Sequence, residues 1–304
     1  MTSHVAPIAL VATLAAAGAL AFATLGRPSL PDAVGLCRPA HLPVQLATTS
    51  KIDQADPHKA TLASTATRRE TTLRPARRAV ASVAEAAEGS AAERDCAART
   101  IVAWARSDAL TDMRGKDANL TRGRLGAEAL VAAVRLDERG AFAPHQRRRV
   151  ATWANELATS TTAFFARGAG PKSKINNHRQ WAGLLVGAAG RLTGDPAHAT
   201  WAREAAELAL CSVTPDGFLP VEMTRGRRAW RYHRYALRPI LALRRLGVWD
   251  GAADPCGSAL PHLRTVAADP SPIGFATGLL QDGPATESSF GPSLRLNRIA
   301  RAGM

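Results

Sequence analysis

Two segments of the chain combine side chains that can bind a carboxylate and move a proton. Residues 176–181 read Asn-Asn-His-Arg-Gln-Trp, and residues 225–235 read Arg-Gly-Arg-Arg-Ala-Trp-Arg-Tyr-His-Arg-Tyr. Both tyrosines of the 304-residue chain, Tyr232 and Tyr235, lie in the second segment. Amide and guanidinium groups neutralise carboxylates, and imidazole and phenol groups transfer protons. The two segments together therefore predict acid–base chemistry on an anionic substrate, without a metal or other cofactor.

The second segment has the spacing of a helix face. On a helix, Arg228, Tyr232 and Tyr235 stand at i, i+4 and i+7. Arg231 lies one turn before Tyr235, and a nearby guanidinium lowers the pKa of a tyrosine from its usual value of about 10. Pro239 is expected to kink or end the helix just after Tyr235. Taken alone, the segment is equally open to interpretation as a solvated basic face with two anchoring aromatic residues.

The first segment stands at the start of a helix. Asn176 or Asn177 is expected to cap it, and the Gly-Asp-Pro turn at 194–196 is expected to end it. A lone histidine such as His178 on an apolar face is more often a core residue than a catalyst, but Asn177 beside it adds a donor where the helix dipole favours anions. The apolar face of the helix consists of Trp181, Leu184, Leu185, Ala188, Ala189 and Leu192.

Helical periodicity recurs from about residue 74 onward, and no convincing period-two alternation appears. The connecting segments hold Gly, Pro and Asp, so short turns should join antiparallel helix hairpins and the chain should be all-α. Five of the six tryptophans fall one per predicted helix, as expected for packing residues. The further helical stretches are 93–110, 123–137, 145–166, 198–212, 228–247 and 256–267.

The chain divides into three predicted parts. Residues 1–23 have the apolar stretch and small-x-small site of a secretory signal, with an uncleaved membrane anchor as the alternative. Residues 24–72 form an N-terminal segment, polar from 44 onward, that reads as a loop or mobile arm. Residues 73–304 are long enough for one large domain with a sizeable core.

The cysteine count bears on the disulfides of the chain, and the net charge bears on the class of its binding partner. Four cysteines in an exported chain predict two disulfides, and we favour Cys37–Cys96 with Cys211–Cys256 among three possible connectivities. A formal charge of +14 attracts polyanions: nucleic acid, an anionic membrane surface or an acidic polysaccharide. An arginine-biased genome would give the same charge. Nucleic-acid signatures, zinc spacing, nucleophile elbows, phosphate loops and dinucleotide fingerprints are absent from the sequence.

These residues resemble the mannuronate-type alginate lyases of polysaccharide lyase family five. That family carries Asn-Asn-His-x-aromatic-Trp, then Gly-Phe-Leu-Pro-x-Glu, then Arg-Ala-x-x-Tyr-His-x-Tyr. A lid pattern, Ser-Lys-Tyr-x-x-Ser-Asp, precedes them, and a helix follows the cysteine at position 96. The corresponding residues here are 176–181, 217–222, 228–235, 50–56 and 101–110, and the likeness covers about residues 36–250.

The resemblance implies an incomplete (α/α) toroid, or barrel, of antiparallel helix hairpins around a cleft. It implies an exported enzyme, periplasmic or secreted, that cleaves a polyuronate, above all mannuronate-rich alginate, by β-elimination. Asn177, His178 and Arg228 would neutralise the carboxylate next to the C5 proton, which stabilises the enolate-like intermediate. Tyr235 would remove that proton and then protonate the departing O4.

Substrate binding is implied for a second group of residues. Lys51 would reach over the cleft from the lid, and Trp181 would shape a sugar subsite. Further contacts are expected from Arg231, Tyr232 and His233. We expect a monomer with an anionic polysaccharide as its partner, and neither nucleic acid nor a stable membrane partner.

The sequence departs from the family pattern in three places. Gln180 replaces the aromatic residue before Trp181, and Ile52 and Ala55 replace the lid tyrosine and serine. Beyond residue 250 the usual Trp-Leu-Glu-Pro-like segment is not found. Another polyuronate such as glucuronan, or non-catalytic binding of an acidic polysaccharide, therefore remains an alternative function. The uronate epimer, and endo or exo action, are left open.

Overall fold

The computed structural model describes residues 39–51, 53, 55–56, 61–248, 255–257 and 259–283. All of them belong to the compact unit formed by residues 37–304. The predicted signal at 1–23 and the predicted disulfide partner Cys37 lie outside the described residues. Within the described part, no helix combines the length and apolarity needed to cross a membrane.

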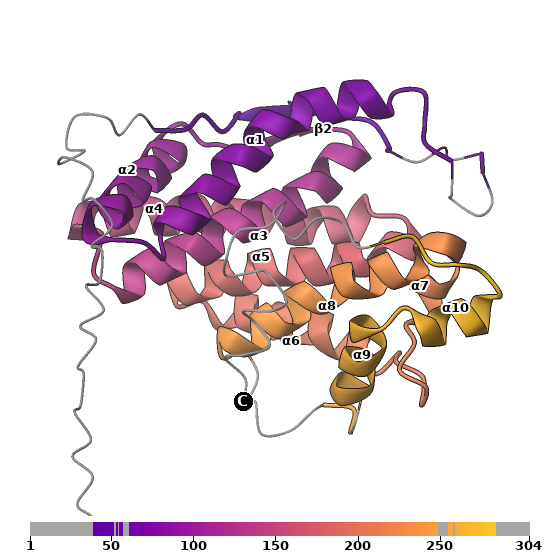
Figure 1. The fold of residues 1–304 in the computed structure, drawn as a ribbon. Coiled ribbons are helices and arrows are strands. Elements are labelled where there is room, and N and C mark those ends of the chain that lie inside the picture. The colour runs from indigo at the N-terminus through magenta and orange to yellow at the C-terminus, as the bar shows by residue number, and fades with distance from the viewer. Residues whose placement is uncertain are drawn as a thin grey trace, which may run out of the picture. The chain divides into compact units, whose positions relative to one another are not determined.

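The described chain is built from helices joined by short turns, as the sequence predicted (Figure 1). Its first helix begins earlier than expected, at Ala66, so the predicted boundary at residues 72 and 73 falls inside it. The helices are α1 (Ala66–Ala86), α2 (Ala91–Arg106), α3 (Lys116–Glu138), α4 (Pro144–Arg167), α5 (Asn177–Thr193), α6 (Pro196–Leu210), α7 (Pro220–Met223), α8 (Ala229–Arg245), α9 (Ala259–Ala268) and α10 (Ser271–Thr277), with 3-10 turns η2 (Pro171–Lys174) and η3 (Gly226–Arg228).

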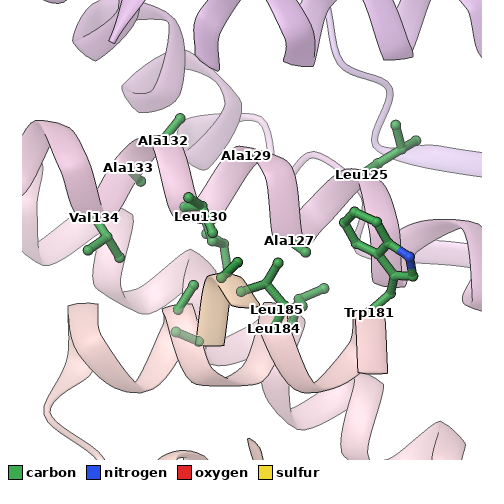
Figure 2. Close-up of a cluster of buried hydrophobic side chains, with 14 of the residues drawn as sticks. Leu125, Ala127, Ala129, Leu130, Ala132, Ala133, Val134, Trp181, Leu184 and Leu185 are labelled. Carbon is green, nitrogen blue, oxygen red and sulfur yellow. The ribbon is translucent and has the colours of Figure 1, made fainter. Parts of the chain in front are cut away.

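Helix α5 lies at the centre and packs against α3, α4, α6 and α8. It begins where the Asn176 side chain accepts a hydrogen bond from the His178 amide at 3.0 Å, and it ends at Gly194, whose φ is +77°. Figure 2 shows apolar side chains of α3 and α5, including Leu130 and Leu185, filling the space between these two helices. A Cβ atom at Gly183 would lie 2.7 Å from the Ala205 side chain, so this glycine allows α6 to approach closely.

A short parallel pair of strands accompanies the helices. Strand β1 (Gln45–Ala47) pairs with β2 (Asp112–Arg114), with Leu46 opposite Met113. The backbone just before β1 is tied down as well, because the Leu110 amide donates to the Pro43 carbonyl at 2.8 Å. With three residues each, the strands are too short for a period-two pattern to be recognised in the sequence. Part of the predicted loop at 44–72 is therefore fixed to the helical body.

Helix α8 continues through Pro239 to Arg245, in agreement with the predicted helical stretch at 228–247, so the proline does not end it. The residues after the proline, among them Ile240 and Leu243, are buried in the core, so burial of apolar surface outweighs the missing backbone hydrogen bond. A disulfide joins Cys211 and Cys256, as predicted, with their Cα atoms 5.1 Å apart. It connects the end of α6 to the turn that precedes α9.

Candidate functional site

Glu222 joins the two sequence segments that carry the candidate chemistry. Its Oε1 accepts hydrogen bonds from the backbone amide of Asn177 at 3.0 Å and from the Asn177 side-chain Nδ2 at 2.8 Å. Its Oε2 lies 3.4 Å from Nε of Arg225. The Glu222 side chain comes from the short helix α7 and is only 1% exposed as a residue. This buried carboxylate therefore fixes the start of α5 against the turn that leads into α8.

His178 is neutral at neutral pH. Burial lowers the pKa of its imidazole to about 4, and the positive charges of Arg225, Arg69 and Lys116 act in the same direction. A neutral imidazole can accept a proton or donate a hydrogen bond, but it does not add charge to the site. Within residues 225–235, Arg225 is therefore an arginine whose charge lowers the pKa of His178. It stands three residues before Arg228, which was predicted to act together with His178 on the substrate carboxylate.

The Tyr235 phenol is packed between aromatic and charged groups. Its ring centroid lies 5.1 Å from that of Trp181 and 6.4 Å from that of Tyr232. Burial raises the pKa of Tyr235 above its ordinary value; the positive charge of Arg124 opposes this effect, and the negative charge of Glu128 adds to it. The expected lowering is therefore wrong in direction, because the loss of hydration on burial outweighs the nearby positive charge.

Arg124 and Glu128 of α3 are functional candidates that the sequence analysis missed. The Arg124 guanidinium carbon lies 5.9 Å from the ring centroids of both Trp181 and Tyr235. Its Nε lies 2.9 Å from Oε1 of Glu128. A signal existed: an Arg–Glu pair at i and i+4 near the start of the predicted helix 123–137, just before the apolar run 129–134.

The predicted lid residue Lys51 lies beside a basic cluster formed by α1 and α8. Lys51 is exposed at the surface, yet partial burial lowers its pKa, and the charges of Arg231, Arg77 and Arg69 lower it further. Arg231 was expected to lower the pKa of Tyr235. In the structure, its charge lowers the pKa of Lys51. The backbone at Lys51 is held in place, because the Lys51 carbonyl accepts a hydrogen bond from the Ala63 amide at 3.0 Å.

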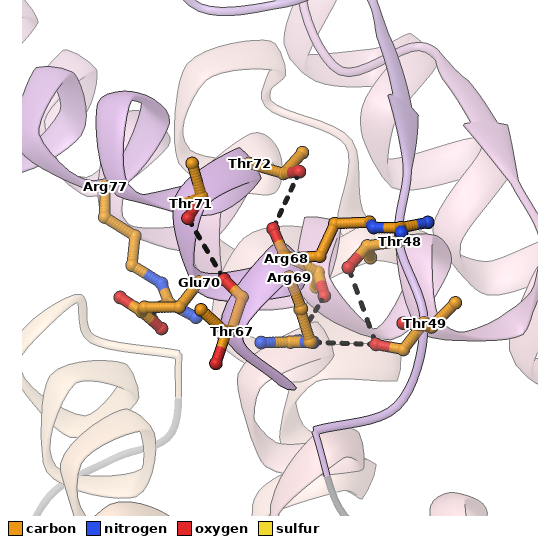
Figure 3. Close-up of polar contacts among 10 residues, drawn as sticks. Thr48, Thr49, Thr67, Arg68, Arg69, Glu70, Thr71, Thr72 and Arg77 are labelled. Carbon is orange, nitrogen blue, oxygen red and sulfur yellow. Dashed lines mark hydrogen bonds and ion pairs between the residues drawn. The ribbon is translucent and has the colours of Figure 1, made fainter. Parts of the chain in front are cut away.

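Two arginines of α1 are fixed near the lid (Figure 3). Arg69 donates from Nε to the Thr49 carbonyl at 2.8 Å, and from its terminal nitrogen to Thr121 Oγ1 at 3.0 Å. Arg77 pairs with Glu70 at 2.6 Å. Arg69 thus connects the chain just before Lys51 to α3, and the cluster keeps an excess of positive charge.

Arg228 lies at the start of α8 and faces the C-terminal segment. Its Nε is 3.7 Å from Oδ2 of Asp282, and its side chain is 19% exposed. Asp282 is held in place because its amide donates to the Arg227 carbonyl at 2.7 Å. A carboxylate of the chain itself therefore stands beside the guanidinium that was expected to bind the carboxylate of a substrate.

Two residues that were predicted to bind substrate, Trp181 and His233, are buried in the structure. His233 is fully buried: its Nε2 accepts from the Leu219 amide and its Nδ1 donates to the Ala229 carbonyl, both at 2.8 Å. Trp181 is 1% exposed and packs beside Tyr235, so it supports the phenol rather than forming the surface of a subsite. Tyr232 is half-buried, with the Arg225 guanidinium 4.8 Å from its ring centroid.

The described residues contain no group of three or more His, Cys, Asp or Glu side chains arranged to hold a metal ion. The site instead consists of an amide, a neutral imidazole and a phenol, surrounded by guanidinium groups. It is assembled from α1, α3, α5, the α7–η3 turn and α8. Figure 1 shows α7, the N-terminal end of α8 and α10 at the same end of the structure.

Known proteins with similar sequences are lyases. A polysaccharide lyase of Stenotrophomonas maltophilia (strain K279a) is 39% identical over 103 residues, which cover 34% of this chain and 30% of that protein. Alginate lyases of Pseudomonas syringae pv. syringae and Azotobacter vinelandii are each 31% identical, over 50% and 54% of this chain. The chain spans 41% and 45% of the length of these two relatives.

Solved structures show the same fold. A histidine-to-alanine variant of alginate lyase A1-III complexed with tetrasaccharide matches with a TM-score of 0.67 and 21% identity, over 84% of this chain and 74% of that one. The crystal structure of alginate lyase A1-III from Sphingomonas species A1 matches with a TM-score of 0.63. The helices thus form the (α/α) toroid that the sequence predicted. Since the family model of alginate lyases matches residues 43–251, which include the lid, Arg124, Glu222 and Tyr235, the chain belongs to the alginate lyase family.

Proposed function

We propose that the chain is a lyase that cleaves a polyuronate by β-elimination, with mannuronate-rich alginate as the foremost substrate. The observation that carries this proposal is that the two segments meet: Glu222 bonds to Asn177 and pairs with Arg225, and the Trp181 ring of the first segment packs against Tyr235 of the second. The sequence relatives named above are alginate and polysaccharide lyases. A tyrosine-to-phenylalanine variant of alginate lyase A1-III has been solved with a tetrasaccharide, so a related fold binds an oligosaccharide.

The chemistry follows from the acidity of the uronate C5 proton. The Asn177 amide, oriented by Glu222, and the guanidinium groups of the site would neutralise the adjacent carboxylate and stabilise the enolate-like intermediate. The phenolate form of Tyr235 would take the C5 proton to form this intermediate, and the bond between C4 and O4 would then break. The same phenol would then return a proton to O4, which suits a substrate whose proton and leaving group lie on one face.

His178 would take a different part for the opposite epimer. There, the C5 proton and the O4 leaving group lie on opposite faces, so one phenol cannot serve both. Its pKa of about 4 leaves the imidazole unprotonated at neutral pH, which is the form that a base requires, and also makes it a weaker base than an ordinary histidine. Activity on guluronate would therefore rest on His178 as the base, with Tyr235 as the acid.

The direct test of the function is the ultraviolet absorbance of the conjugated double bond that β-elimination creates. The purified chain is assayed on mannuronan, mixed alginate and glucuronan. We expect a rise in absorbance that is fastest on mannuronan; activity only on glucuronan would support the alternative polyuronate. Retention of oligouronate at low salt, with no absorbance change on any polymer, would instead identify a non-catalytic binder.

Asp282 is expected to compete with the substrate for Arg228. Replacing Asp282 with asparagine removes the carboxylate, so we expect KM for the polyuronate to fall about 1.4- to 5-fold, as for loss of a partly exposed ion pair of about 0.2–1 kcal/mol. The matched control is Asp95→Asn on α2, which removes an equally negative partner from the exposed Arg99. A KM that is unchanged, or that falls equally in the control, would show that Asp282 does not compete.

Export is also part of the proposal. The disulfide between Cys211 and Cys256 supports an oxidising compartment, since disulfides persist mainly in the periplasm or outside the cell. The positive charge of the chain supports a polyanionic substrate, whose capture it would speed. We propose a periplasmic or secreted monomer that acts without a cofactor.

A further inference from the structure

The proposed proton carrier is in contact with an ion pair that the reaction scheme above does not use. Arg124 and Glu128 stand one turn apart on α3, with Arg124 Nε 2.9 Å from Glu128 Oε1. Both side chains are largely buried, 15% exposed for Arg124 and 1% for Glu128. Placing two opposite charges in a core is costly, and the pair alone is weak support for stability. Stability alone therefore does not explain why this ion pair is buried beside Tyr235.

The geometry connects the pair to the phenol. Arg124 hydrogen-bonds to the side chain of Tyr235, and its guanidinium carbon lies 5.9 Å from the ring centroids of both Tyr235 and Trp181. The guanidinium therefore lies near both rings, and its Nε donates to Glu128. Arg124 thus has little freedom to move away from the phenol oxygen.

We propose that Arg124 is a positioning residue for Tyr235: fixed by Glu128, its guanidinium holds the phenol oxygen in place and supplies the positive charge that the phenolate needs. This proposal rests on the proposed function, because it takes Tyr235 as the proton carrier. Burial raises the pKa of Tyr235, so the phenolate is the scarcer form at neutral pH. A group that stabilises the phenolate then raises the fraction of competent enzyme.

Other titratable groups act on Tyr235 from α1 and from its own helix, α8. Arg77 of α1 lowers the pKa of the phenol, and Tyr232 of α8 raises it. Arg69 of α1 is also within electrostatic reach of Tyr235. Arg77 is already neutralised in part by its ion pair with Glu70, and Arg69 is bonded to Thr49 and Thr121. Arg124 is the charge that both touches the phenol and is fixed by a buried partner.

Removing the charge of Glu128 and removing the charge of Arg124 should shift the Tyr235 pKa in opposite directions. Glu128→Gln removes a negative charge that opposes the phenolate, while its remaining amide oxygen can still accept from Arg124. The Tyr235 pKa should then fall, and the ascending limb of the rate against pH should move to lower pH. Arg124→Gln removes the charge that stabilises the phenolate. The Tyr235 pKa should then rise, and the ascending limb of the rate should move to higher pH. Shifts of about one pH unit are expected for charges this close.

The scarcity of tyrosine makes a direct measurement possible. In a Tyr232→Phe background, Tyr235 is the single tyrosine of the chain, so phenolate absorbance reports on it alone. The titration is repeated with Glu128→Gln, Arg124→Gln and Arg124→Lys added, at pH values where circular dichroism shows the helices intact. We expect the pKa to fall with the first variant, rise with the second and return part of the way with the third.

The titration needs no substrate, so it stands apart from the test of function. Opposite shifts in titration without lyase activity would uphold the ion pair's effect on Tyr235 and overturn the proposed function. Lyase activity with equal titration curves in all variants would overturn the role of Arg124. The pH profile of kcat/KM on mannuronan supplies the second readout, and a purely structural role would lower turnover without moving that profile.

Discussion

Replacing Tyr235 with phenylalanine is expected to lower turnover at least about 10²-fold while substrate binding stays largely intact, in line with general acid–base contributions. The substitution removes the hydroxyl that takes the C5 proton and returns one to O4. It keeps the ring, and with it the contacts to Trp181 and Tyr232. The measurement is kcat and KM by double-bond absorbance, together with the binding of oligouronate to the variant.

Tyr232→Phe is the matched control for Tyr235→Phe. It removes the same hydroxyl from a ring 6.4 Å away on the same helix. Because Tyr232 is proposed to contact substrate and not to carry the proton, its loss should appear mainly in KM. Near-normal turnover of Tyr235→Phe, or an equal loss of kcat in both variants, would show that Tyr235 is not the proton carrier.

Replacing Glu222 with alanine is expected to lower the free energy of unfolding by about 3–5 kcal/mol, the usual cost of removing one partner from a buried charged pair. The change leaves the Arg225 guanidinium without this carboxylate. It also removes the acceptor for two donors of Asn177. Chemical denaturation followed by circular dichroism gives the stability, and absorbance at temperatures where the variant is folded gives the remaining activity.

Two controls separate the roles of Glu222. Glu222→Gln keeps an oxygen that can accept from Asn177 but loses the charge that faces Arg225, so its stability should lie between those of the alanine variant and the native chain. Glu156→Ala removes an exposed carboxylate from α4 and should change stability by no more than about 0.5 kcal/mol. If Glu222→Ala is as stable as Glu156→Ala, the buried carboxylate does not hold the site together.

The helices could be predicted from the sequence because their signals are local. Asn176 and Gly194 mark the two ends of α5 by chemistry that acts within one turn. The candidate residues of the site could also be proposed from local patterns, since Asn177 and His178 are neighbours in the chain and Tyr235 stands within a short motif. At Pro239 the local signals pointed two ways, since the proline favours a kink or an end and the periodicity favours a helix over 228–247. Tertiary packing decides for the helix, because the residues beyond the proline are buried.

The rest of the site depends on contacts between residues far apart in the chain. Arg124 touches Tyr235 across more than a hundred residues, and nothing in the local pattern of α3 shows which side chain its guanidinium faces. The pKa direction of Tyr235 was mispredicted for the same reason, because burial is a property of the folded chain. Asp282, beside Arg228, likewise comes from a segment with no recognisable motif.

The parallel pair of β1 and β2 has a consequence for the order of folding. Gln45 and Asp112, whose side chains are hydrogen-bonded at 2.8 Å, stand 67 positions apart, with α1 and α2 between them. Contacts this distant in the chain form more slowly than the turns of a helix, because the intervening segment must first become compact. We therefore expect α1 and α2 to form before Lys51 is brought to its place. Newly made chains would then have these two helices before the segment around Lys51 is in place.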